Sequence, residues 1–207
     1  VAGAPKDGAK GCGYVKLASA TRSDAMHLLA ECYQYGYGGE KDLEKAIVTF
    51  RRAGDMGLPK SRCAEGNVLI ELGRDQARAV ELCRQGAEAG DADAQTDLGN
   101  FYLEGKLIAR DMAQARRWYE KAAAQDQANA AFVLGQIYWN GDGVAKDNAK
   151  AAQLWRVAYD RGREDAAFHL GNEAFVRAGR GSGKWTQAGL AEARDWYAKA
   201  VDARNAE

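Results

Sequence analysis

The chain has 207 residues with 29 basic and 29 acidic side chains, so its formal net charge at pH 7 is zero. This balance gives no general electrostatic attraction for a nucleic acid or an anionic membrane. Hydrophobic residues make up 46% of the chain, but no apolar run approaches the ~20 residues that span a bilayer. We therefore expect no nucleic-acid partner and no transmembrane segment.

The composition favours an all-α protein, because two prolines against 24 glycines suit helices joined by short loops. Residues 1–9 are expected to be disordered and 10–22 to form a leading half-repeat. The N-terminus has neither an initiator Met nor an apolar signal core, so it resembles a mature or truncated end.

A repeat of about 36 residues follows. The pairs Leu98-Gly99, Leu134-Gly135 and Leu170-Gly171 recur at intervals of 36, with Leu29-Ala30 and Glu65-Gly66 as weaker copies. Within each unit, apolar residues at helical spacing predict two helices around a loop. The aromatic residues of this stripe are interpreted as packing residues. The predicted repeats are 24–57, 59–90, 91–126, 127–162 and 163–203.

Repeat 127–162 is the most regular. It contains, in order, Leu134-Gly135, Tyr138, Gly141-Asp142-Gly143-Val144, Asp147, Lys150-Ala151 and Trp155. This pattern resembles the Sel-one-like repeat (SLR) family, a class of α/α solenoids related to tetratricopeptide repeats. The resemblance covers about 180 of the 207 residues. It implies one solenoid domain over 1–207, a right-handed α/α superhelix of about five helix-turn-helix repeats, which acts as a non-catalytic scaffold without a cofactor.

The four cysteines form two pairs, Cys12 with Cys32 and Cys63 with Cys83, each separated by 20 residues. Each pair straddles a predicted turn, so its members lie opposite each other in an antiparallel helix pair. This placement predicts two disulfides and an oxidising compartment. The alternative is four buried free thiols in a cytoplasmic protein. A metal site at His27, Glu31 and Cys32 is disfavoured, because no second ligand pair has zinc spacing.

Other candidate motifs fail on their chemistry. The loop Gly179 to Lys184 is one residue too short for a phosphate-binding loop and continues into Trp185. Trp185 is interpreted as an exposed anchor or as a cap on the last helix pair. Neither His27 nor His169 has a Ser or Cys placed beside it. Asp91, Asp93 and Asp97 are interpreted as marking the start of a helix.

A groove lined by the first helix of each pair is the expected binding surface. Its mixture of amide, acidic and apolar side chains suits a folded protein or peptide. The predicted groove residues are Asp97, Asn100, Phe101, Val133, Gln136, Ile137, Asn140, His169, Asn172 and Glu173, with Trp185 in the last loop.

The predicted function is stoichiometric protein binding. We favour a bacterial periplasmic inhibitor, either an immunity protein that neutralises a secreted toxin or a signalling regulator. The alternative within scaffolds is an assembly adaptor for an envelope, polysaccharide or secretion complex. An enzyme and a glycan-binding module are the alternatives from other classes.

Overall fold

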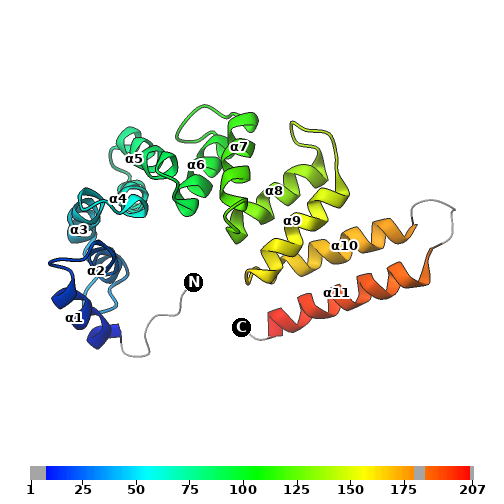
Figure 1. Ribbon diagram of the computed structural model, residues 1–207, viewed down its shortest axis with the longest axis horizontal. Helices are drawn as coiled ribbons and strands as arrows, with labels where there is room; N and C mark the ends of the chain where they lie inside the picture. The colour runs from blue at the N-terminus through cyan, green and yellow to red at the C-terminus, as the bar shows by residue number, and fades with distance from the viewer. Residues whose placement is uncertain (1–7, 180–184, 206–207) are drawn as a thin grey trace. The chain divides into compact units, whose positions relative to one another are not determined.

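The computed structural model describes residues 8–179 and 185–205, and every regular element in these ranges is an α-helix (Figure 1). The predicted all-α class is thereby confirmed. Helix α1 begins at Gly8, so residues 8 and 9, which we expected to be disordered, are helical. Residues 1–7 and most of the Gly-rich loop after Gly179 lie outside the described ranges. The helices are α1 Gly8–Ala18, α2 Ser23–Tyr35, α3 Leu43–Asp55, α4 Pro59–Glu71, α5 Gln76–Glu88, α6 Ala92–Glu104, α7 Met112–Ala123, α8 Ala128–Asn140, α9 Asn148–Asp160, α10 Ala166–Gly179 and α11 Gln187–Asn205.

The helices belong to two compact units, a first unit of Val1–Arg110 and a second unit of Asp111–Glu207. Within each unit, consecutive helices pack side by side, as in an α/α solenoid. The expectation of one domain over residues 1–207 stays a prediction. None of the helices in the described ranges is both long and apolar enough to cross a membrane.

Aspartate begins the second helix of several pairs. The side chains of Asp42, Asp111 and Asp147 accept hydrogen bonds from backbone N–H groups in the first turns of α3, α7 and α9. These N–H groups have no partner within the helix, so the capping bond stabilises each helix start. Gly141 ends α8 with a φ of 82°, and its N–H bonds to the carbonyl of Ile137. The recurring Gly and Asp of the loops are therefore turn residues.

Small residues let the helices of a pair approach closely. A Cβ atom added to Gly135 of α8 would lie 2.5 Å from Nε1 of Trp155 on α9. The Trp155 side chain is 1% exposed, and its Nε1 donates a hydrogen bond to the carbonyl of Phe132 at 3.2 Å. The alanines that mark the second helix of each repeat are also buried, namely Ala46, Ala79, Ala115, Ala151 and Ala193.

Glu65 of α4 interrupts this pattern, because it stands where other repeats carry a buried leucine such as Leu134. The glutamate is fully buried, and its Oε1 accepts hydrogen bonds from Arg51 at 2.9 Å and Arg78 at 3.2 Å. Its Oε2 has no hydrogen-bond partner within the described residues. A buried charge with an unsatisfied oxygen opposes folding, so Glu65 lowers the stability of the first unit.

Replacing Glu65 with leucine is expected to raise the free energy of unfolding of the first unit by about 1–4 kcal/mol. The leucine removes the buried charge and fills similar volume, while the half-exposed Arg51 and Arg78 side chains stay solvated. Urea unfolding followed by circular dichroism measures the change. Glu65→Ala serves as the control and should destabilise, because it leaves a cavity. A leucine variant less stable than the wild type would show that the ion pairs are net stabilising.

Candidate partner-binding site

A cavity of about 350 Å³ lies in the first unit against α2, α4 and α6, the first helices of three successive pairs. These are the helices that we expected to line a groove. Helix α3 contributes the buried ring of Phe50. The other lining residues are His27, Glu31, Gln34 and Tyr35 from α2, Lys60, Cys63, Ala64 and Asn67 from α4, and Asp91, Asp93, Ala94 and Asp97 from α6 and its N-terminus.

The lining of this cavity is acidic. It carries four carboxylates, Glu31, Asp91, Asp93 and Asp97, and one lysine, Lys60. Asp91 is the N-cap residue of α6 and Asp93 lies in its first turn, so both stand at the helix start as expected. Asp97 lies further along α6, and the expectation that it marks a helix start is wrong. Its side chain faces the cavity instead.

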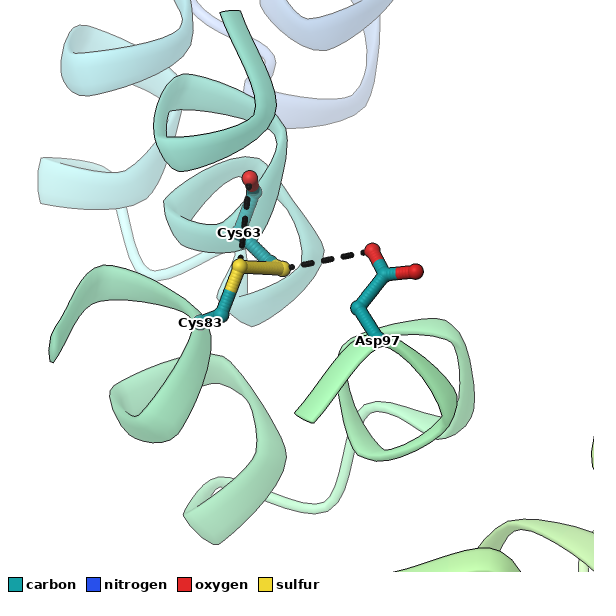
Figure 2. Close-up of side chains that lie close together, drawn as sticks. All are labelled: Cys63, Cys83 and Asp97. Atoms are coloured by element: carbon teal, nitrogen blue, oxygen red, sulfur yellow. Dashed lines mark hydrogen bonds between the residues drawn. A yellow bond between two sulfur atoms is a disulfide. The ribbon is translucent and has the colours of Figure 1, made fainter. Parts of the chain in front are cut away.

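Asp97 is held against the Cys63–Cys83 disulfide (Figure 2). Its Oδ2 accepts a hydrogen bond from Nδ2 of Asn67 at 2.8 Å and lies 3.4 Å from Sγ of Cys63. The disulfide sulfur carries no proton, so this second contact gives the carboxylate no hydrogen bond. Burial raises the pKa of Asp97. The carboxylate is thus poorly solvated and has one polar partner on this oxygen.

His27 connects the cavity to the core. Its Nδ1 lies 2.9 Å from Oγ of Ser61, and its ring packs on Phe50 with the centroids 5.1 Å apart. Its Nε2 lies 3.5 Å from a carboxylate oxygen of Glu31, one turn along α2. This interaction with His27 lowers the pKa of Glu31. His27 therefore orients Glu31, which also lines the cavity.

These contacts define what the cavity can bind. A guanidinium or ammonium group would offer Asp97 and its neighbouring carboxylates hydrogen-bond donors and opposite charge. An anion would meet repulsion from the same groups. The arrangement therefore selects for a cationic group.

The structure contains both predicted disulfides: Cys12–Cys32 joins α1 to α2, and Cys63–Cys83 joins α4 to α5. The alternative of four free thiols is therefore wrong for this structure. The ligand atoms of Cys63, Cys83 and Asp97 lie within 4.8 Å of one another. Because metals bind thiolates, the bridged sulfurs do not form a metal site. The disfavoured metal site at His27, Glu31 and Cys32 lacks a thiolate for the same reason, because Cys32 is bridged to Cys12.

The two disulfides are expected to differ in their rate of reduction. Cys63 and Cys83 are 3% and 0% exposed, whereas Cys12 is 9% exposed and Cys32 is half-buried, and both of the latter line a surface pocket. A dithiothreitol thiolate must reach a sulfur, and the carboxylate of Asp97 repels it at Cys63. We expect Cys12–Cys32 to be reduced at least about tenfold faster. Timed alkylation and peptide mass spectrometry measure both rates. Earlier alkylation of Cys63 and Cys83 would contradict this order.

The other groove residues predicted in the first unit are Asn100 and Phe101. Both lie on α6 and are half-buried, but neither lines the cavity. Of the three predicted residues of this repeat, only Asp97 therefore reaches it. Whether Asn100 and Phe101 contact a partner stays a prediction.

In the second unit, α8 presents Val133 and Gln136 half-buried and Asn140 exposed. Ile137 is 2% exposed and belongs to the core, because α8 packs against both α7 and α9 and buries most of its circumference. Whether Ile137 contacts a partner stays a prediction.

On α10, His169 is half-buried among aromatic rings, including Phe132 and Trp155 at centroid distances of 5.0 and 4.8 Å. Oδ1 of Asn172 accepts a hydrogen bond from the hydroxyl of Tyr197 at 2.8 Å. Glu173 is 7% exposed and accepts a hydrogen bond from Nε of Arg177 at 3.2 Å. Glu173 is thus largely buried, and whether it contacts a partner stays a prediction.

Trp185 combines features of the two predicted roles, an exposed anchor and a cap on the last helix pair. Its side chain is 50% exposed, and its ring stacks on Phe175 with a centroid distance of 4.6 Å. A Cβ atom on Gly179 would lie 2.9 Å from the same ring. Trp185 therefore folds back onto the end of α10 and keeps one face open to solvent.

Most residues of the acidic cavity were missed by the sequence reasoning. A usable signal was present, because polar residues about one period apart meet across neighbouring pairs. His27 contacts Ser61, and Cys63 contacts Asp97, each at a separation of 34 residues. Searching for polar pairs at this spacing would have linked α2, α4 and α6.

Comparisons with known proteins agree with this architecture. The Sel1 repeat family matches residues 23–58, 66–91, 92–127, 128–162 and 165–205. No curated protein matches the chain.

Solved structures share the fold. A Sel1 repeat protein from Oxalobacter formigenes is 27% identical, with a TM-score of 0.75 over 91% of this chain and 75% of that chain. Cysteine-rich protein B from Helicobacter pylori is 25% identical, with a TM-score of 0.54 over 63% of this chain and 96% of that one. An immunity protein from Pseudomonas aeruginosa is 21% identical, with a TM-score of 0.66 over 96% of this chain and 75% of that chain.

The family segments follow the repeats predicted from the sequence, and together they cover most of the chain. The predicted resemblance is thereby confirmed, and the chain belongs to the Sel1 repeat family.

Proposed function

We propose that this chain is a non-catalytic protein-binding protein whose acidic cavity receives a basic side chain of its partner. The observation that carries the proposal is a cavity lined by the first helices of three successive pairs, with four carboxylates that come from α2 and from α6 and its N-cap. Asp97 in particular is buried beside a disulfide and accepts one hydrogen bond from Asn67. A lysine or arginine of a partner would pair with these carboxylates in a poorly solvated site, where charge-assisted hydrogen bonds are strong.

Within this class we favour a periplasmic inhibitor of the immunity-protein or signalling-regulator type. Two disulfides support an oxidising compartment outside the cytoplasm. Two solved structures with this fold are described as immunity proteins from Pseudomonas aeruginosa. An assembly adaptor for an envelope or secretion complex uses the same surface, and the identity of the partner separates the two roles.

The geometry supports an enzymatic function less well than it supports protein binding. His27 of the cavity lining lies 2.9 Å from Oγ of Ser61, but Ser61 is 0% exposed and His27 is 6% exposed. A nucleophile must reach its substrate, so this pair is better understood as a core hydrogen bond. The cavity's cysteine is bridged and is not a nucleophile.

One observation favours a glycan-binding module as the second candidate. Phe175 and Trp185 form a stacked pair with exposed fractions of 44% and 50%, and exposed aromatic rings bind sugar faces. Isothermal titration with fragments of envelope polysaccharide tests this candidate. Heat of binding that disappears in Trp185→Ala would support it over the protein-binding role.

Capture from a cell-envelope extract tests the main proposal. The immobilised chain should retain one protein in about equimolar amount, and recovery should fall as NaCl rises from about 50 to 500 mM because salt screens the charge contacts. Recovery that does not change with salt would contradict the role of the acidic cavity. Recovery of no protein above bare resin would contradict protein binding itself.

A further inference from the structure

The second unit contains an arginine held on a phenyl ring. Arg163 follows α9, and the central carbon of its guanidinium lies 4.2 Å from the ring centroid of Phe132 on α8. The same guanidinium donates hydrogen bonds to Asn129 through Nη1 and to Asp165 through Nε and Nη2. Phe132 is 6% exposed in this arrangement. The chain thus binds its own arginine by stacking on an aromatic face and by hydrogen bonds to side-chain oxygens.

The next repeat carries a second copy of this arginine-binding arrangement, and the aromatic ring of this copy is exposed to solvent. Phe168 and Asp165 stand one period of 36 residues after Phe132 and Asn129, so the ring is preserved and the amide becomes a carboxylate. Phe168 is 48% exposed, whereas Phe132 is covered. The open ring lines a cavity of about 550 Å³ between α10 and α11.

The walls of this cavity match the parts of an arginine side chain. Glu164 and Asp165 provide carboxylates at one edge, and Ala200 and Val201 of α11 provide apolar surface. Asp165 already pairs with Arg163, so the exposed Glu164 supplies the additional negative charge. The ring of Tyr197 lies 5.9 Å from that of Phe168 and extends the aromatic wall.

We propose that the cavity between α10 and α11 binds an arginine side chain of a protein partner, with its guanidinium on the Phe168 ring and paired with Glu164. The planar guanidinium fits this site better than an ammonium, because it stacks on the ring and reaches carboxylate oxygens at its edge. This binding surface lies in the second unit and does not depend on the acidic cavity of the first.

Titration with N-acetyl-arginine amide tests the proposal without a known partner. Aromatic NMR spectra of chain labelled with ¹³C at its five phenylalanines follow the Phe168 ring, and Phe168→Leu assigns its signal. We expect a saturable shift with a dissociation constant of about 1–10 mM, the range of a single side-chain contact. The neutral isostere N-acetyl-citrulline amide should bind at least about fivefold more weakly. Glu164→Gln should weaken arginine binding by a similar factor.

Two controls test whether the shift arises from arginine binding at Phe168. Glu31→Gln, in the cavity of the first unit, should leave the Phe168 shift unchanged, so a failure of either site is seen independently. N-acetyl-leucine amide should bind more weakly than the arginine probe. No saturable shift, equal binding of the citrulline or leucine probe, or unchanged binding in Glu164→Gln would overturn the proposal.

Discussion

A chain that carries both Glu31→Lys and Asp93→Lys is expected to bind its partner at least about 100-fold more weakly than the wild type. The change leaves two carboxylates and three lysines around a cavity that has four carboxylates and one lysine in the wild type. A basic side chain of the partner then meets like charge beside Asp97, which costs several kcal/mol in a poorly solvated site. Isothermal titration with the captured partner measures the dissociation constant.

The matched control reverses the same number of charges away from the cavity. Glu81 and Glu88 are exposed on α5, which contributes no residue to the cavity lining. Glu81→Lys with Glu88→Lys should change the affinity by less than about tenfold, since the overall charge acts mainly through screened long-range attraction. An equal loss of partner affinity in both double variants would show that net charge, and not the cavity, causes the effect.

Trp155→Ala is expected to lower the free energy of unfolding of the second unit by about 3–5 kcal/mol. The side chain is 1% exposed and packs over Gly135, where nothing larger than hydrogen fits. Its loss leaves a large cavity and removes the donor to the carbonyl of Phe132. Guanidinium unfolding followed by circular dichroism gives the value for the transition of this unit.

Trp185→Ala is the control for the loss of a tryptophan. Trp185 is 50% exposed and stacks on Phe175, so its removal should cost about 1 kcal/mol or less. Similar losses for the two variants would contradict the view that the tight pairing of Gly135 and Trp155 stabilises this repeat.

The sequence predicted the repeats well, because two independent features recur with one period. The Leu-Gly pairs lie on the first helix and the buried alanines, such as Ala151, on the second. A helix pair cannot bury its apolar face alone, so this periodicity leads directly to stacked pairs. The disulfides were predictable for a related reason, since both cysteine pairs lie at equal distances from a turn.

The functional surface was harder to predict. The repeat pattern places Glu65 at a leucine position that other repeats bury, but it does not show that Arg51 and Arg78 pair with the glutamate there. Ile137 and Glu173 were assigned to the groove although both are buried. Helices that pack on both sides bury most of their circumference, so helical spacing alone does not separate a groove position from a core position. The cavity around Asp97 depends on contacts between successive pairs, which no single repeat encodes.

Photo-crosslinking from the cavity tests the central claim most directly. Tyr35 lines the acidic cavity and is 56% exposed, so the larger side chain of p-benzoylphenylalanine can replace it without entering the core. Val48 on α3 is 63% exposed and does not line the cavity, and it carries the same crosslinker in the control. The account predicts a crosslink from position 35 to a partner peptide that contains lysine or arginine, and none from position 48. Crosslinks from position 48 alone would show that the partner binds elsewhere.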